Sequence, residues 1–124
     1  DPAGIVFHPR FIEYFDWSCI AFFEAATGLS QVGLKGTYGL AGIPIVDLEV
    51  KFLRPVAFDD HVQVFTTLEA IGNSSLKYRH CLVKGGDVAV ECRQTRVWCE
   101  LDPTDGKSLK GRPVPAELVA KLKR

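Results

Sequence analysis

The residues best equipped for chemistry stand at the beginning of the chain, ahead of a predicted helix. Asp1 supplies a carboxylate, which can attack a carbonyl carbon or act as a general base, and His8 supplies an imidazole. Pro9 fits the first turn of a helix, where free N–H groups carry the positive end of the helix dipole and can polarise a carbonyl group. From the residues alone, Asp1 is more simply the cap of a turn before Gly4, and His8 fits a helix-entry residue held by local hydrogen bonds.

The other polar residues give weaker signals. Asp16 follows Pro9 by seven positions, so both fall on one side of the predicted helix, where a solvated face is the simpler interpretation. His61 opens a predicted strand and His80 lies on an apolar strand face, so both are predicted to be structural. Most of the basic side chains are predicted to be solvated; they are Arg54, Lys77, Arg79, Arg93, Arg96, Lys107 and Lys110.

Composition excludes several classes of protein. With 124 residues, 47% of them hydrophobic and 24% charged, the chain is long and apolar enough for one globular domain and is not intrinsically disordered. Lys plus Arg and Asp plus Glu both number 15, so no net charge draws the chain to nucleic acid or to an anionic membrane. No apolar run approaches the roughly 18–20 residues of a membrane span. We therefore expect a cytoplasmic protein.

The four cysteines indicate neither a zinc site nor a disulfide framework. They lack C-x-x-C spacing, and each stands in an apolar setting. We expect reduced thiols in the core. The four are Cys19, Cys81, Cys92 and Cys99.

One strongly apolar helix is predicted from Pro9 to Thr27, followed by Gly28. Its apolar stripe carries four phenylalanines, which predicts a helix covered on most sides. From Leu29 to Gly42 a glycine recurs at every third position, which predicts a loop. The stripe consists of Phe11, Ile12, Phe15, Ser18, Cys19, Phe22, Phe23 and Ala26.

The hydrophobic period then changes to two, which predicts four strands separated by turns. In the first strand the even-numbered apolar residues are expected to face the core. Only the early helix offers a large apolar body to cover such a sheet, so we expect an α+β fold in which an antiparallel sheet wraps around a central helix. The predicted strands are Ile45–Leu53, His61–Ala70, Leu76–Lys84 and Val88–Leu101, and the tail Pro115–Lys123 is predicted to be a short helix.

This order resembles the hotdog fold, and local segments resemble the 4-hydroxybenzoyl-CoA thioesterase family within it. The segments are Asp1-Pro2-Ala3-Gly4-Ile5-Val6 continued by His8-Pro9-Arg10-Phe11, then Gly42-Ile43-Pro44-Ile45-Val46, Phe52-Leu53-Arg54-Pro55 with Phe58-Asp59-Asp60-His61-Val62, and Arg112-Pro113-Val114-Pro115. The resemblance implies one hotdog domain over residues 1–124. Family members normally carry one more strand before the acidic residue. Since the chain has no Met and begins at Asp1, we expect that strand to lie upstream.

The resemblance also implies an active site. Asp1 is then the catalytic carboxylate, as nucleophile or as general base, and the backbone N–H near His8 polarises the thioester carbonyl. Related acyl-CoA thioesterases also place a catalytic His seven residues after the acid, whereas the 4-hydroxybenzoyl enzyme has Tyr there. Trp17 either lines the acyl pocket or packs against the sheet or a partner subunit. The implied substrate-binding residues are Gly4, Pro9, Asp16, Trp17, Gly42, Ile43, Pro44, Asn73, Ser74 and Ser75.

By resemblance, the activity is hydrolysis of an acyl- or aroyl-CoA to the free acid and CoA, with no metal or redox cofactor. The partners implied are the acyl-CoA substrate and further copies of the chain in a homodimer or homotetramer with the site at the subunit interface. No nucleic acid or membrane partner is expected. Basic residues would hold the CoA phosphates, and the candidates are Arg54, Lys77, Arg79, Arg93, Arg96, Lys107 and Lys110. Two alternatives stay open: a hotdog hydratase or dehydratase, and a non-catalytic acyl-CoA-binding module.

Overall fold

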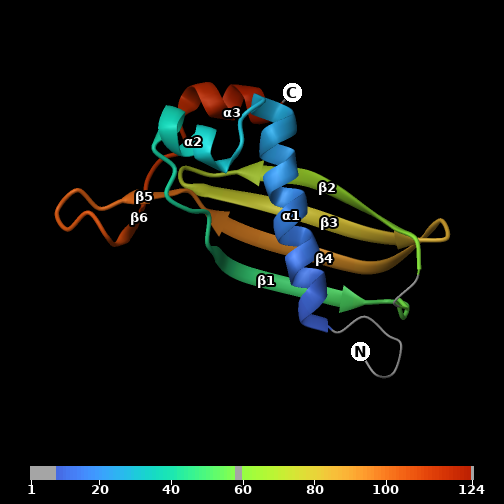
Figure 1. Cartoon of the computed structure of the whole chain (residues 1–124). Helices are drawn as coiled ribbons and strands as arrows, with labels where there is room; N and C mark the ends of the chain where they lie inside the picture. The colour runs from blue at the N-terminus through green and yellow to red at the C-terminus, as the bar shows by residue number, and fades with distance from the viewer. Residues whose placement is uncertain (1–7, 58–59, 124) are drawn as a thin grey trace.

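A long helix crosses one face of a four-stranded antiparallel sheet in the computed structural model, which describes residues 8–57 and 60–123 (Figure 1). The strands lie in the order β1-β4-β3-β2, and β5 and β6 form a separate two-stranded arm. The elements are α1 (His8–Thr27), α2 (Gln31–Tyr38), β1 (Ile45–Phe52), β2 (Val62–Ile71), β3 (Ser75–Lys84), β4 (Asp87–Val97), β5 (Cys99–Leu101), β6 (Leu109–Gly111) and α3 (Ala116–Leu122).

The helix α1 buries one stripe of aromatic residues against the sheet. Phe11, Phe15, Cys19 and Phe23 recur every four residues and are all buried. Burying each Phe side chain contributes about 1.5–3 kcal/mol. The opposite side of the helix is exposed, with Trp17 59% exposed, so the prediction that the helix is covered on most sides is wrong for the single chain. The rings line up on one stripe, so one sheet face is enough to bury them.

Even-numbered residues of the central strands face α1. Register pairs Thr66 with His80 and His80 with Cys92, and the side chains on this inner face are largely buried. Odd-numbered residues form the outer face, where charged side chains such as Arg79 and Glu91 pair with each other. The predicted α+β class and antiparallel sheet are therefore confirmed.

The first strand is where it was predicted, but its burial differs. Val46 is 61% exposed and Leu48 is 39% exposed. The helix crosses the sheet obliquely, so its first turns reach only the far end of β1, where the rings of Phe11 and Phe52 are 5.6 Å apart (Figure 1). A register shift between Ile45 and Asp47 adds to the irregularity at the near end. Leu48, Val50 and Phe52 pair with Gln94, Cys92 and Val90 and so lie on the inner face of the sheet, as predicted, but the helix leaves Leu48 and Phe52 partly exposed.

The loop predicted over Leu29–Gly42 is wrong, because α2 forms within it. The Ser30 side chain caps the helix by accepting a hydrogen bond from the Gly33 N–H, at 3.3 Å. Gly39 ends the helix in the left-handed conformation, with φ of 76°. Leu34 anchors α2 by inserting its side chain into the core. Burial of this side chain outweighs the cost of two glycines inside the helix.

The fourth predicted strand is divided at Trp98. This side chain is fully buried and donates a hydrogen bond from Nε1 to Glu100 Oε2, at 3.1 Å. The chain leaves the main sheet here and continues as β5, whose partner β6 was not predicted. The C-terminal helix was predicted correctly, and Leu118 and Leu122 bury its apolar side.

All four cysteines are free, as predicted. Burial raises the pKa of Cys19 to about 11 and that of Cys92 to about 12, so these thiols stay protonated at neutral pH. Cys81 lies half-buried on the outer face rather than in the core. None of the helices in the described part of the chain is long and apolar enough to span a membrane.

Candidate active site

The predicted catalytic segment is described only from the start of α1. Asp1 and Gly4 lie outside the described residues. For His8 and Pro9 the structure gives the backbone, which belongs to the first turn of α1. The N–H groups expected to polarise a carbonyl therefore lie at the N-terminus of a helix of 20 residues.

The two predicted substrate-binding loops meet on residues 97–99. The Val97 N–H donates to the Pro44 carbonyl at 3.1 Å, and the Cys99 N–H donates to the Gly42 carbonyl at 2.9 Å. Between them, the Trp98 N–H donates to the Ser74 carbonyl at 2.8 Å. Segments 42–44 and 73–75 are thus held to the same three residues. We call residues 97–99 the junction.

The side chains of these loops differ in exposure. Gly42 and Ile43 are half-buried, whereas Pro44 is exposed. Asn73 is exposed, and its carbonyl accepts a hydrogen bond from the Val114 N–H at 2.9 Å. Ser74 and Ser75, which follow it in the turn and at the start of β3, are half-buried. The fold positions these loops through their backbones.

Asp16 and Arg96 form an ion pair that overturns two predictions. Arg96 is 5% exposed, because residue 96 lies on the inner face of the sheet, and its Nη2 donates to Asp16 Oδ1. The Asp16 side chain is 45% exposed. Asp16 is therefore more than a solvated helix residue, and the prediction that Arg96 is a solvated cation is wrong. A buried guanidinium needs such a partner to offset the loss of hydration.

A chain of polar side chains continues from Arg96 under the helix. Arg96 Nε donates to Gln94 Oε1 at 3.0 Å, and His80 Nε2 lies 3.1 Å from the same oxygen. His80 Nδ1 lies 2.8 Å from the hydroxyl of Thr66. Because Gln94 Oε1 can only accept, His80 carries its proton on Nε2 and accepts from Thr66. We call these five residues, Asp16 included, the polar chain.

His80 links Thr66 to Gln94 within the polar chain and is, as predicted, a buried structural residue. Its imidazole stacks on the Phe15 ring at 5.0 Å and on the Tyr78 ring at 5.9 Å. Burial lowers the pKa of His80 to about 4; the hydrogen bond that His80 donates to Gln94 opposes this shift, and the charge of Arg96 adds to it. His80 is therefore neutral at physiological pH. His61, in contrast, is exposed and directly precedes β2.

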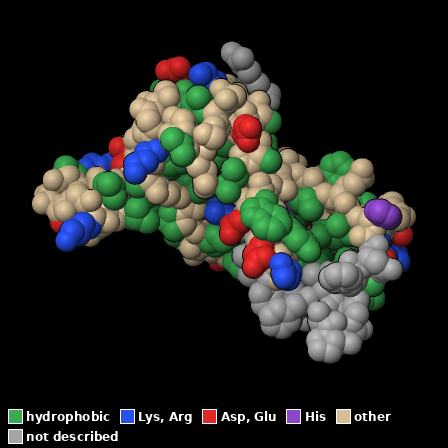
Figure 2. Space-filling model, viewed as in Figure 1, with side chains coloured by type: hydrophobic (Ala, Val, Ile, Leu, Met, Phe, Trp, Pro, Cys, Tyr) green, Lys and Arg blue, Asp and Glu red, His purple; other side chains and the backbone are tan. Residues whose placement is uncertain are grey.

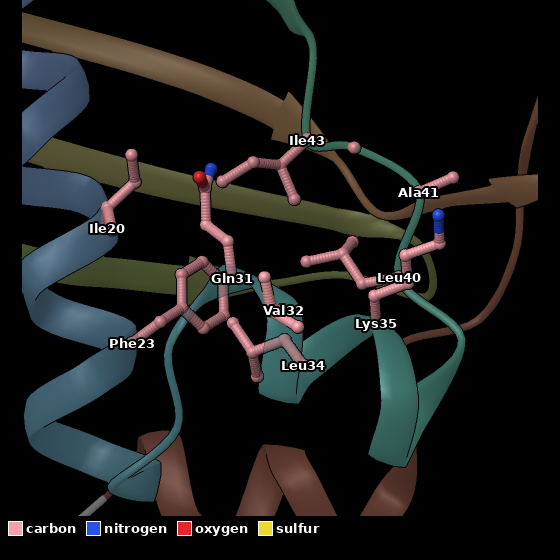
Figure 3. A pocket seen from close by; sticks show the side chains of 10 residues that line it. Ile20, Phe23, Gln31, Val32, Leu34, Lys35, Leu40, Ala41 and Ile43 are labelled. Atoms are coloured by element: carbon pink, nitrogen blue, oxygen red, sulfur yellow. The ribbon is translucent and has the colours of Figure 1, made fainter.

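A pocket of about 270 Å³ opens between α1, α2 and the loop before β1 (Figure 3). Gln31 extends from α2 into the space between Ile20 and Ile43 in this view. Most of the lining is apolar, which suits an apolar group of a ligand. We call it the α1–α2 pocket; it is lined by Ile20, Phe23, Gln31, Val32, Leu34, Lys35, Leu40, Ala41, Gly42 and Ile43.

Sequence reasoning found only the Gly42–Ile43 side of this pocket. The α2 residues were missed because the glycines hid the helix. Ser30 as an N-cap and Gly39 as a C-cap were the signals that would have revealed it.

Trp17 lies on a second hollow, on the exposed side of α1. Its ring centroid is 5.9 Å from that of Tyr14. A shallow apolar groove of about 340 Å³ runs here between α1 and the edge strand β2, lined by Tyr14, Trp17, Ser18, Ala21, Val62 and Val64. Hydrophobic side chains gather along α1 on this side of the molecule, with acidic and basic side chains beside them (Figure 2). Trp17 therefore does not line the α1–α2 pocket of its own chain.

The basic residues predicted as phosphate ligands do not converge on one place. Arg54 pairs with Asp87, and Arg79 and Arg93 pair with Glu91 on the outer sheet face. Lys77, Lys107 and Lys110 are exposed. Lys35, which lines the α1–α2 pocket, was not among the predicted cations.

Among residues 8–57 and 60–123, no three His, Cys, Asp or Glu side chains cluster so that they could hold a metal ion. That the reaction needs neither metal nor redox cofactor stays a prediction.

Comparison with known proteins gives consistent matches over nearly the whole chain. The family model of the thioesterase-like superfamily matches residues 1–122. The 4-hydroxybenzoyl-CoA thioesterase of Pseudomonas sp. (strain CBS-3) is 27% identical over 124 residues, which cover 96% of this chain and 86% of that enzyme. The structure of 4-hydroxybenzoyl-CoA thioesterase from that strain matches with a TM-score of 0.87 at 25% identity, covering 98% of this chain and 88% of that one.

A gentisyl-coenzyme A thioesterase structure matches with a TM-score of 0.80 at 28% identity, covering 96% of this chain and 89% of that one. These matches confirm the hotdog fold and the family resemblance that the sequence segments indicated.

Proposed function

Since this chain belongs to the thioesterase-like superfamily, we propose that it hydrolyses an acyl- or aroyl-CoA thioester to the free acid and CoA. The observation that carries this proposal is the family match over residues 1–122, which includes the segment with the acidic residue. The similar proteins named above act on aroyl-CoA thioesters, 4-hydroxybenzoyl-CoA and gentisyl-CoA. The chain is thus a thioester hydrolase.

We place the chemical step at the N-terminus of α1. Water supplies the oxygen that bonds to the carbonyl carbon, the carbon–sulfur bond breaks, and the CoA sulfur leaves as a thiol after protonation. The Asp1 carboxylate either attacks first, with water releasing the acid from the resulting anhydride, or removes a proton from the attacking water. The N–H groups near His8 stabilise the oxyanion that develops on the carbonyl oxygen. The His8 imidazole assists proton transfer.

The substrate-binding residues belong to three parts of the fold. Segments 42–44 and 73–75 are fastened to the junction, and we assign the former to the acyl side and the latter to the pantetheine arm. Asp16, held by Arg96, contributes from α1 together with Trp17, while Gly4 and Pro9 shape the approach to the helix start. The apolar lining of the α1–α2 pocket supports an acyl group of substantial size.

Helix geometry supports a site shared between two chains. Ile20, in the α1–α2 pocket, follows His8 by twelve residues along α1, which is a distance of about 18 Å at 1.5 Å per residue. A pocket so far from the N-terminus of its own helix is better placed to serve the catalytic segment of another copy. We therefore propose a homodimer or homotetramer as the active form.

Replacing the acidic residue tests the assignment. We expect Asp1→Asn to lower kcat by about 10²–10⁴-fold, because the amide neither attacks nor accepts a proton. The affinity for CoA should stay unchanged. Free-thiol release from acyl-CoA measures the first quantity, and calorimetry with CoA measures the second. Asp47→Asn, the same chemical change at an exposed position of β1, serves as control. Full turnover by Asp1→Asn would sink the assignment.

A substrate panel tests the activity itself. We expect thiol release from at least one of acetyl-CoA, a long-chain acyl-CoA and benzoyl-CoA. If none released thiol while CoA still bound, the chain would be an acyl-CoA-binding module. Hydration of an enoyl-CoA without thiol release would instead indicate a hydratase. We propose the cytoplasm as its location, supported by the four free cysteines.

A further inference from the structure

Arg96 connects three different parts of the fold through its three nitrogen atoms. Nε donates to Gln94 Oε1 on the same strand at 3.0 Å, Nη1 donates to the Ile43 carbonyl at 3.1 Å, and Nη2 donates to Asp16 on α1. The residue is 5% exposed. A guanidinium is a planar fork of fixed geometry, so its partners are held at fixed relative positions.

Other members of the polar chain hold the guanidinium of Arg96 in place. Gln94 Oε1 accepts from both Arg96 and His80, and His80 is fixed by Thr66 and by the Phe15 ring stacked on it. These contacts leave Arg96 little freedom to turn away from α1 and the loop. The ion pair is therefore a rigid link between two elements and not only a neutralised charge.

Both elements joined by Arg96 are walls of the α1–α2 pocket. Ile43 lines the pocket on the loop side, and its carbonyl is the group that Arg96 holds. On the helix side, Asp16 lies four residues before Ile20, which places it one turn from the pocket on the same face. The distance between the two walls thus depends on the Arg96 fork.

We propose that Arg96 is a positioning residue for acyl specificity: by holding Asp16 and the Ile43 carbonyl at a fixed separation, it sets the width of the pocket that receives bulky acyl groups. This inference rests on the function proposed above. It concerns the binding of the acyl group and leaves the chemical step at the start of α1 unchanged.

Removing the Arg96 guanidinium should lower kcat/KM selectively for substrates with large acyl groups. In Arg96→Gln the amide is too short to reach both partners, and the Asp16 carboxylate stays solvated because it is half-exposed, so the protein is expected to fold. We expect kcat/KM for benzoyl-CoA and octanoyl-CoA to fall by about tenfold or more, through KM, because misplaced walls no longer fit the group. For acetyl-CoA, which is too small to fill the pocket, the change should stay under about twofold.

The test compares kcat and KM of four proteins on these three substrates: wild type, Arg96→Gln, Arg96→Lys and Lys51→Gln. Lysine keeps the charge but contacts one partner at a time, so Arg96→Lys should fall between wild type and Arg96→Gln. Lys51→Gln removes a cation from the exposed face of β1, where it pairs with Glu49, and should match wild type. An equal loss on all three substrates would mean a merely structural role and would overturn the proposal.

Hydrogen exchange gives an answer that does not depend on activity. In Arg96→Gln we expect faster exchange of amides within residues 40–46 than in wild type or Lys51→Gln, because the loop loses one of its anchors. Unchanged exchange there would overturn the proposal even if the kinetics changed. A wild type that hydrolysed none of the substrates would contradict the proposed function, while the exchange result would still decide whether Arg96 holds the loop.

Discussion

Two polar groups under α1 lack partners, in contrast to the otherwise well-connected polar chain. Among the described residues the Tyr78 hydroxyl and Gln94 Nε2 are buried without a hydrogen bond of normal geometry. The Cys19 thiol beside the Tyr78 hydroxyl is only a weak partner, and burial raises the pKa of this phenol well above its usual range. Burying an unpaired hydroxyl costs free energy. Tyr78 thus contributes to stability through its ring and not through its oxygen.

We expect Tyr78→Phe to leave the free energy of unfolding unchanged or to raise it by up to about 1 kcal/mol, since the ring contacts stay and the unpaired hydroxyl is removed. Urea unfolding measures the change. Trp98→Phe is the contrasting variant, because it removes a hydrogen bond to Glu100 and leaves space in the core, so it should destabilise. A loss of more than about 1 kcal/mol in Tyr78→Phe would show that its hydroxyl is satisfied.

For single residues, the sequence predicted burial correctly where the neighbouring residues indicated one environment. His80 was predicted to be structural from its apolar neighbours, and it is buried. Arg96 was taken as solvated because of its charge, although it shares even numbering with Val90 and Cys92 on the inner face of β4. Its partner Asp16 is 80 positions earlier in the chain. No local pattern connects the two, so only the fold could reveal the pair.

Among the elements, α2 shows how far local propensity can mislead. Glycine disfavours a helix interior by about 1 kcal/mol relative to alanine, and two glycines fall within eight residues. The helix forms because its caps and the buried Leu34 outweigh this cost. The strands were predicted more reliably, because their alternation extended over eight to eleven residues. The break at Trp98 was missed because alternation continues across it.

The two glycines of α2 should respond differently to alanine. A Cβ added at Gly36 meets no atom within 4 Å, so Gly36→Ala should raise the free energy of unfolding by about 0.5–1 kcal/mol. A Cβ at Gly33 would lie 3.2 Å from Leu29 Cβ and Cδ2, so Gly33→Ala should gain less or lose stability. Chemical denaturation of the two variants beside wild type tests this order. The reverse order would contradict the packing described for α2.

For the whole molecule, the neutral His80 makes stability depend on pH. Its pKa is about 4 when folded and about 6.5 when unfolded, so the unfolded chain binds more protons between these values. The contribution is complete above pH 6.5 and is lost as the pH falls towards 4. The expected loss is on the order of 2–3 kcal/mol.

Wild type should therefore lose more stability between pH 7 and pH 4 than His80→Gln does, by roughly this 2–3 kcal/mol. Urea unfolding at several pH values gives both curves, and carboxylate effects common to both proteins cancel in the difference. His61→Gln, which changes an exposed imidazole, should follow wild type. Parallel curves for wild type and His80→Gln would mean that His80 titrates normally.

The overall architecture was predictable from the sequence, because one apolar helix and four alternating strands have few ways to bury each other. The predicted catalytic residue Asp1 lies outside the described residues, so its place in the site stays a prediction. The α1–α2 pocket was not predicted, since it needs α2, and the two glycines inside this helix outweighed the capping signals at Ser30 and Gly39.

The junction has a consequence for how such a protein can change over time. It fastens segments 42–44 and 73–75 by backbone groups alone, and the Trp98 carbonyl also accepts the Arg112 N–H at 3.0 Å. Main-chain bonds of this kind are available to almost any amino acid, so loop side chains are free to be replaced while the scaffold keeps its shape. Sequences only a quarter identical can then share one frame and present different surfaces to different acyl groups. Retargeting this enzyme should thus begin with loop side chains and spare residues 97–99.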